Sequence, residues 1–189
     1  MIIGEHAVIR SADLDDAHAF AALYDPTYPR SFMLDARREL QNPSPDEVRE
    51  SLRLKEFRHG IFYVIEDRSG TVRGFSAVKT AGHEMSYAEM LCAFFDDSDS
   101  ETPMASEFMR FIKRLCLVDR RLNKLIAQHL DNETGYGRLL EHEGFQLNGR
   151  QRQLLFTQGR YYDLLTYSLF RRDYEAACQN TATASQNGG

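Results

Sequence analysis

The chain has 189 residues, of which 42% are hydrophobic and 27% are charged, as is ordinary for a globular protein. Its formal net charge of -5 gives no electrostatic attraction to nucleic acid or to an anionic membrane. No apolar run is long enough to span a bilayer, and the first residues lack a secretory pattern. We therefore expect a single cytoplasmic domain, with no nucleic-acid or membrane partner.

The three cysteines are odd in number and lie far apart in the sequence, at Cys92, Cys116 and Cys178. Their spacing matches no common arrangement of metal ligands. We expect reduced thiols and no metal site.

The chain begins with a short strand at 6–10 and a helix capped by Ser11 or Asp13. A second helix starts at Pro45, where Ser44 and Glu47 are spaced close to a capping box. The rest predicts a hairpin (60–67 and 72–82), a strand (84–95), an amphipathic helix (103–122), a strand (123–130), a short helix ending at Gly144, and a last hairpin (146–157 and 160–170). The small, polar tail 176–189 predicts disorder, which leaves a domain at 1–175.

Three local sequences resemble the GNAT superfamily of acetyl-CoA-dependent N-acetyltransferases. They are "AVIRSADLDDAHAFAALY", "LLEHEGF" and "LNGRQRQLLFTQGRYYDLLTYSLFRRDYE". The resemblance is strongest to the branch with the ribosomal-protein N-terminal acetyltransferases and the spermidine acetyltransferases, and it covers roughly residues 6–175. The matching C-terminal positions are Gly149, Arg152, Gly159, Tyr161 or Tyr162, Asp163, Tyr167, Ser168, Leu169 and Tyr174.

This resemblance implies an α/β (α+β) fold with helices on both faces of a mixed, mostly antiparallel sheet. The sheet would have six to seven strands, splayed into a V between the strands at 84–95 and 123–130. Acetyl-CoA would be the co-substrate, with its pantetheine arm lying in the V as a pseudo-strand. The resemblance implies that the arm contacts Cys92, Ala93, Phe94 and Asn132, and that the pyrophosphate meets the amides of Met104, Ala105 and Ser106.

The segment "FFDDSDSETPMASEF" departs from the family's phosphate-binding loop, which resembles "G-x-G-Y-A-T-E-A". Its two glycines are replaced here by Glu101 and Pro103, so one position carries a negative charge and the other lacks an N–H. A loss of about 3–6 kcal/mol would move a micromolar ligand to the millimolar range. Either the loop bends away and CoA still binds, or CoA binding is lost, or the acids hold a cation. The third is disfavoured because Thr102 and Phe108 stand where a calcium loop needs glycine and glutamate.

Acetyl transfer to an amine needs a base for the ammonium and an acid for the departing thiolate. Glu89 lies on the strand that carries the base in similar enzymes, and Glu84 is the alternative. The usual tyrosine position is Leu140 here, so Tyr136, one turn earlier, is the candidate acid. Both candidates have ordinary structural alternatives, as a solvent-facing strand residue and a helix tyrosine. Candidate acceptor-binding residues are Tyr28, Arg30, Phe32 and Tyr162.

The sequence therefore predicts an N-acetyltransferase that moves an acetyl group directly from acetyl-CoA to a primary amine. The acceptor would be a peptide N-terminus or a small polyamine-like molecule. The alternative is a non-catalytic GNAT-fold binding or sensor module that has lost CoA. Basic residues converging on 101–107 would favour the enzyme. The oligomeric state stays open, with a homodimer among the options.

Overall fold

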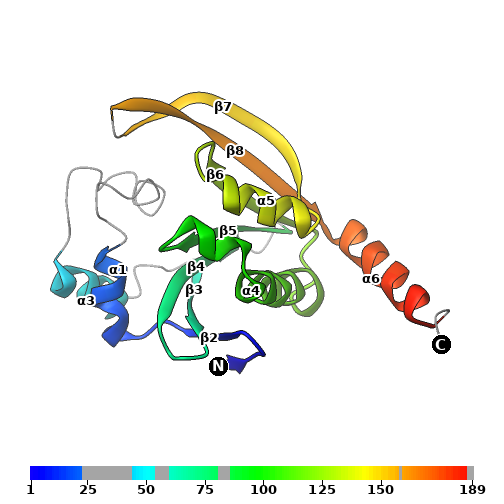
Figure 1. The fold of residues 1–189 in the computed structure, drawn as a ribbon, viewed down its shortest axis with the longest axis horizontal. Coiled ribbons are helices and arrows are strands. Elements are labelled where there is room, and N and C mark those ends of the chain that lie inside the picture. Colours follow the sequence, from blue (N-terminus) through cyan, green and yellow to red (C-terminus); the bar gives the residue numbers. More distant parts are fainter. Residues whose placement is uncertain (23–43, 54–59, 81–85, 158, 187–189) are drawn as a thin grey trace.

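The computed structural model describes residues 1–22, 44–53, 60–80, 86–157 and 159–186. The described strands form one sheet in the order β1-β2-β3-β4-β5-β6-β8-β7 (Figure 1). Only the pair β5–β6 is parallel, so the sheet is mixed and mostly antiparallel, as predicted. The strands are β1 (Ile2–Ile3), β2 (Ala7–Ser11), β3 (Gly60–Asp67), β4 (Val72–Thr80), β5 (Tyr87–Phe94), β6 (Lys124–Leu130), β7 (Gln146–Thr157) and β8 (Arg160–Phe170).

The sheet has eight strands rather than the six to seven expected. The two-residue β1 was missed because a strand this short carries no alternation pattern. It pairs with β2 after a tight turn in which the Gly4 N–H donates to the carbonyl of Ala7 (2.8 Å).

The V predicted from the sequence lies between β5 and β6. Their ladder runs from Tyr87 opposite Lys124 to Met90 opposite Ala127 and ends there. Both strands continue beyond this point, β5 to Phe94 and β6 to Leu130. The vertex of the V is therefore at Met90, and its mouth faces the C-terminal ends of both strands.

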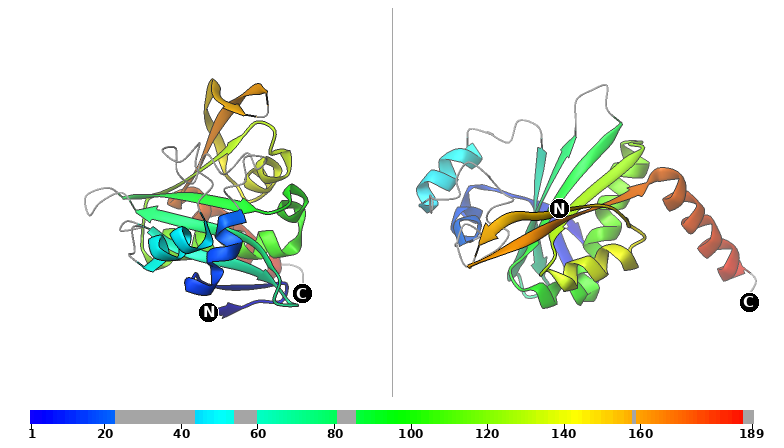
Figure 2. Two further views of the ribbon diagram at one scale, coloured as in Figure 1. Left: turned by 90° about the vertical axis from the view of Figure 1, so that its left-hand side faces the viewer. Right: turned by 90° about the horizontal axis from the view of Figure 1, so that it is seen from above.

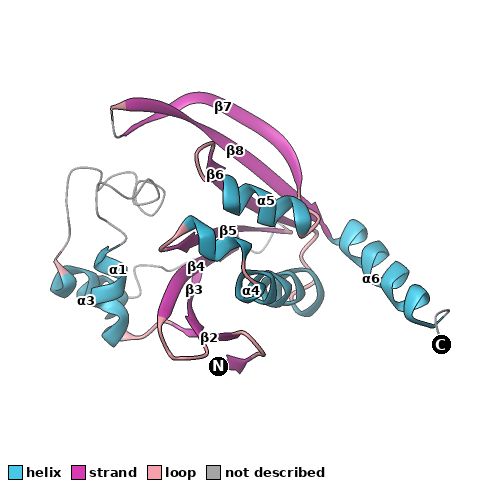
Figure 3. Cartoon of the chain, viewed as in Figure 1, coloured by secondary structure: helices cyan, strands magenta, loops and turns pink. Residues whose placement is uncertain are grey.

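Helices cover both faces of the sheet (Figures 2 and 3). Alternation along β5 separates two cores, because Met90 and Cys92 pack in one and Ala93 in the other. The larger core contains residues of α4 (Pro103–Lys113), π-helical η3 (Arg114–Asp119) and α5 (Thr134–His142). The smaller contains residues of α1 (Ala17–Ala22), which follows η1 (Leu14–Asp16), and of α3 (Pro45–Arg53). The loop after β5 contains one more short helix, η2 (Asp97–Glu101).

The C-terminal segment differs from the prediction. Residues Arg171–Gln186 form helix α6, where disorder was expected from residue 176. The helix extends away from the sheet, with Tyr174 packed on the larger core near its start (Figure 1). Alanine-rich sequence favours a helix even where polar composition suggests disorder. None of the described helices is both long and apolar enough to cross a bilayer.

Candidate active site

The mouth of the V is bounded by the N-termini of two helices. Helix α4 follows β5 and η2, and α5 follows β6, so both helices begin at the same edge of the sheet. A helix N-terminus presents backbone N–H groups and a positive dipole end, which suit an anion. The site implied by the resemblance therefore has the expected framework.

The amides expected to hold the pyrophosphate are only partly available. The N–H groups of Ala105 and Ser106 both donate to the carbonyl of Thr102, at 3.1 and 3.3 Å. Pro103 has no N–H, which leaves Met104 as the amide of this turn that shows no partner among the described residues. Helix α4 alone thus offers fewer donors than a glycine-rich loop would.

The acidic loop forms η2 and turns two of its carboxylates toward α5. Asp97 accepts hydrogen bonds from the backbone N–H groups of Gly135 (2.8 Å) and Tyr136 (3.2 Å). Glu101 accepts a hydrogen bond from Nε of Arg138 (2.6 Å). Asp96 caps η2 itself, by accepting from the N–H of Ser98. These three carboxylates therefore serve as helix caps and an ion pair.

Asp99 differs from the other acids of η2 because its side chain does not bond to α5. Burial raises the pKa of this carboxyl, Arg73 lowers it, and the charges of Asp96 and Asp67 raise it further, for a net rise. Asp99 is thus held near like charges with one arginine opposing them.

Two arginines contact residues 101–107, the segment where converging basic residues would favour an enzyme, and one of them is paired with Glu101. Arg138 lies against Glu101, and the Nε of Arg110 is 3.4 Å from the carbonyl of Ser106. A hollow of about 710 Å³ begins at Ser106 and Arg110 and runs along α4 to the start of α6, where Tyr174 lines it. This hollow is large enough for a nucleotide-sized group.

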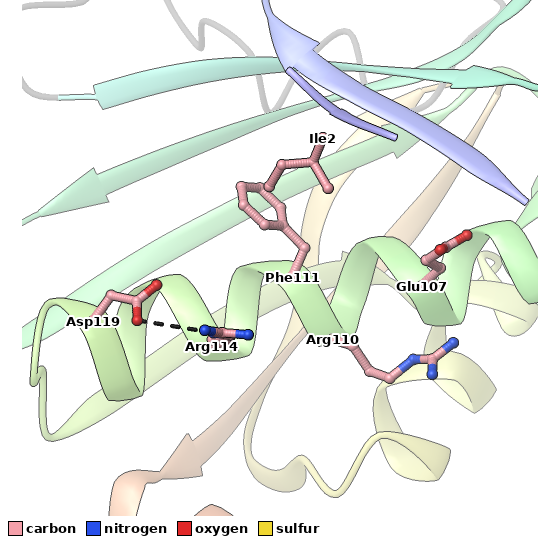
Figure 4. Close-up of a pocket in the computed structure, with 6 residues that line it drawn as sticks. All are labelled: Ile2, Glu107, Arg110, Phe111, Arg114 and Asp119. Atoms are coloured by element: carbon pink, nitrogen blue, oxygen red, sulfur yellow. Dashed lines mark ion pairs between the residues drawn. The ribbon is translucent and has the colours of Figure 1, made fainter. Parts of the chain in front are cut away.

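A second hollow, of about 480 Å³, lies beside the first on α4, and Arg110 lines both (Figure 4). Phe111 points toward Ile2 there, while Arg114 faces Asp119 at 3.9 Å. Glu107, which matches the family's motif, accepts hydrogen bonds from three backbone N–H groups at residues 5–7 (2.8–2.9 Å). Glu107 therefore holds the start of the chain against α4, and none of the candidate site residues that the structure describes lines this hollow.

Glu89 occupies β5 one residue before the vertex of the V. Its side chain is exposed and leaves the sheet on the same face as Ala93, the face covered by α1 and α3. Lys79 is its partner on β4 and Ile126 its partner on β6. A base at this position is open to an acceptor that approaches from the α1–α3 face.

Tyr136 lies on the other face of the sheet, buried in the larger core at 1% exposure. Its ring meets the edge of His129, which stacks on Tyr167 with ring centroids 5.3 Å apart. The Tyr167 hydroxyl donates a hydrogen bond to Glu141 (3.0 Å). Burial is the main cause that raises the pKa of Tyr167, and the contact with Glu141 raises it further. A Cβ on Gly137 would come within 2.9 Å of His129, so this close packing requires glycine. Sequence analysis did not find this aromatic cluster.

The remaining candidates fall into four groups. Cys92, Ala93 and Phe94 line β5 beyond the vertex, with buried side chains, so only their backbone can meet a ligand. Asn132 lies between β6 and α5, and its buried Oδ1 has no hydrogen-bond partner among the described residues. Tyr162 is buried with Leu130, Leu155 and Leu164, and the Arg160 guanidinium lies 4.5 Å from its ring. Glu84, Tyr28, Arg30 and Phe32 lie outside the described residues.

Comparisons with known proteins agree with the architecture. A crystal structure of spermidine N-acetyltransferase from Vibrio cholerae in complex with CoA and spermine superposes with a TM-score of 0.73. It shares 17% identity and covers 90% of this chain and 99% of that one. The crystal structure of a probable acetyltransferase gives a TM-score of 0.70 at 21% identity, covering 90% and 96%. At such identities the likeness shows the fold.

A search of the curated proteins found no match. The family model "Acetyltransferase (GNAT) domain", in contrast, matches residues 9–166. This range contains the splayed strands, both helices at the mouth of the V, and the candidate residues Glu89 and Tyr136. The chain therefore belongs to the GNAT acetyltransferase family, as its local sequences predicted.

Proposed function

We propose that the protein transfers an acetyl group from acetyl-CoA directly to a primary amine of a small polyamine. The observation that carries this proposal is the vertex of the V at Met90, with Glu89 beside it. A pantetheine arm laid along the open part of β5 would bring its thioester to this vertex. The Vibrio cholerae relative whose structure contains CoA and spermine supports the same pair of substrates.

The residues present fit the pantetheine arm better than the phosphates. The buried, unpartnered Oδ1 of Asn132 is an acceptor that an amide N–H of the arm would satisfy. At the phosphate end, Met104 supplies one backbone amide, and Arg110 lies on α4 one turn after Ser106. Acetyl-CoA supplies the activated acetyl group when it is bound.

In this proposal Glu89 and Tyr136 carry out the proton transfers of the reaction. Glu89, directly or through a water molecule, accepts a proton from the acceptor ammonium and so frees the amine lone pair. The amine nitrogen then forms a bond to the thioester carbon as the C–S bond breaks. Tyr136 donates its phenolic proton to the departing thiolate. The phenolate is then reprotonated, through water, by the second proton that the nitrogen loses as the amide forms, so charge and protons balance. The exposed face around Glu89 leaves room for a flexible cation.

The experiment is a thiol-release assay with acetyl-CoA and spermidine, repeated with a short peptide that has a free N-terminus. We expect turnover with spermidine, and a fall of about 100-fold or more in kcat for Glu89→Gln, as for loss of a general base. The KM for acetyl-CoA should stay within about twofold, because Glu89 binds no part of the donor. Glu175→Gln, which removes one carboxylate from α6, is the matched control.

Three results would each contradict a part of this proposal. If neither spermidine nor the peptide is acetylated at millimolar acetyl-CoA, the proposed reaction is excluded. If only the peptide is acetylated, the acetyl transfer stands but its acceptor is a peptide N-terminus and not a polyamine. Full activity of Glu89→Gln would remove Glu89 from its role as base.

A further inference from the structure

Helix η2 forms a bridge across the mouth of the V. Asp97 lies three residues after β5. It accepts hydrogen bonds from backbone N–H groups of α5, the helix that follows β6. The hydrogen bonds therefore join the two sides of the opening. The Glu101–Arg138 ion pair makes a second crossing one helical turn further along α5.

The close approach of η2 to α5 is built into the sequence. A Cβ on Gly135 would lie 2.6 Å from the carbonyl oxygen of Asp97 and 2.9 Å from its carboxylate. Glycine is therefore needed for η2 to reach this position. Ser100 of η2 is buried at 2% exposure, so the short helix packs as part of the fold.

The bridge occupies anion-binding groups on the α5 side of the mouth, across from the α4 amides that are expected to meet the pyrophosphate. The N-terminal amides of α5 and the guanidinium of Arg138 are the donors and the positive charge on that side of the mouth. Asp97 and Glu101 already satisfy them with carboxylate oxygens. A pyrophosphate at the mouth must compete with these two carboxylates and is repelled by their charges.

We infer that Asp97 and Glu101 set the affinity for the acyl donor, by holding η2 closed against α5 until the donor displaces them. This inference rests on the proposed function, since the donor is taken to be a CoA thioester. When the competent form is only a fraction of the population, the apparent dissociation constant rises by the inverse of that fraction. Weakening the bridge should therefore tighten donor binding, although it removes native hydrogen bonds.

The test is calorimetric titration of the full chain with CoA. Asp97→Ala removes both hydrogen bonds and should lower the Kd by roughly 5–10-fold, which corresponds to a closed population of about 80–90%. Asp97→Asn keeps one acceptor oxygen and should give an intermediate value. Glu101→Gln should lower the Kd by a smaller factor. Asp99→Asn removes the same charge from the same short helix without touching α5, so we expect less than about a twofold change.

A structural readout separates the bridge from the charge. Amide hydrogen exchange at Gly135 and Tyr136 should accelerate in Asp97→Ala and stay unchanged in Asp99→Asn, because both amides donate hydrogen bonds to Asp97. Unchanged or weaker CoA binding by Asp97→Ala, with a normal melting curve, would overturn the inference and make Asp97 a helix cap only. An equal gain for Asp99→Asn would also overturn it, since charge alone would then explain the effect.

Failure of the proposed function gives a different result. If neither the parent chain nor any of these folded variants binds CoA at millimolar concentration, the donor assignment itself is wrong. If Asp97→Ala binds and the parent chain does not, the bridge is confirmed as the obstacle.

Discussion

Lys113 and Glu143 form a buried ion pair that joins the C-terminal ends of α4 and α5. The Lys113 Nζ lies 2.6 Å from the Glu143 carboxylate and 3.0 Å from the Glu143 carbonyl oxygen. The two side chains are only 9% and 7% exposed. We predict that Lys113→Met strongly destabilises the protein, because it leaves the buried carboxylate without its lysine partner and with the exposed imidazole of His142, at 3.4 Å, as its neighbour.

The magnitude follows from burial. Removing one member of a buried pair typically costs about 3–5 kcal/mol, against about 0–1 kcal/mol for an exposed pair. For a chain of this size, about 3–5 kcal/mol corresponds to a fall in Tm of roughly 6–20 °C. Equilibrium unfolding in urea, followed by circular dichroism, measures the loss as a lower midpoint at unchanged slope.

The matched control is the double variant Lys113→Met/Glu143→Leu, which replaces both charges by apolar groups of similar volume. We expect it to recover most of the lost stability, since such replacements are often neutral. A loss below about 1 kcal/mol for Lys113→Met alone would refute the reasoning, because it would show that water reaches the carboxylate. Equal losses in the single and double variants would show that packing, rather than charge, is responsible.

Two further predictions concern stability. Burial alone would raise the pKa of Asp16, but hydrogen bonds from Arg10 and from a backbone N–H lower it below its ordinary value. This carboxylate therefore stabilises the fold above about pH 4, and the contribution is lost as the pH falls through the folded pKa. Asp16→Asn should lower the free energy of unfolding at pH 7 and make it fall less steeply between about pH 5 and 3, as measured by urea unfolding at each pH. An unchanged pH dependence in this acid range would contradict the prediction. Gly135→Ala should cost about 1–3 kcal/mol in thermal melting, because its Cβ would meet the Asp97 carbonyl at 2.6 Å, and an unchanged Tm would show that η2 yields freely.

Local patterns in the sequence were sufficient for elements whose determinants are near in the chain. Ser44 and Glu47 do form a reciprocal cap at the start of α3, with the Ser44 N–H donating to Glu47 at 2.7 Å and the Glu47 N–H donating to Ser44 at 3.3 Å. Gly70 and Gly144 have the positive φ expected of a hairpin turn and a helix end. These features follow from spacings of a few residues, which one sequence displays directly.

The binding partners of the acidic residues could not be predicted from such local spacings. Asp97 caps a helix that begins 37 residues later, and Glu107 binds backbone about 100 residues earlier, so neither pairing leaves a local signal. Asp163 matched the family's C-terminal pattern without a clear role. In the structure its carboxylate accepts the N–H of Gln153, whose φ of 52° marks an irregularity in β7. The partner of such a charged residue is known only from the folded structure, because the two residues lie far apart in the sequence.

Helix α5 contacts α4 near its C-terminal end and η2 near its N-terminal end. These two sets of contacts differ in burial, and this difference supports a mouth that opens at one end. At the C-terminal end, Lys113 and Glu143 are almost fully buried, so their separation is costly. At the N-terminal end, Glu101 and Arg138 are 48% and 62% exposed, and a pair in water contributes little. The hydrogen bonds of Asp97 can also be replaced by those of an incoming anion. The end that faces the V is therefore the end where a ligand can displace the contacts without loss of the fold.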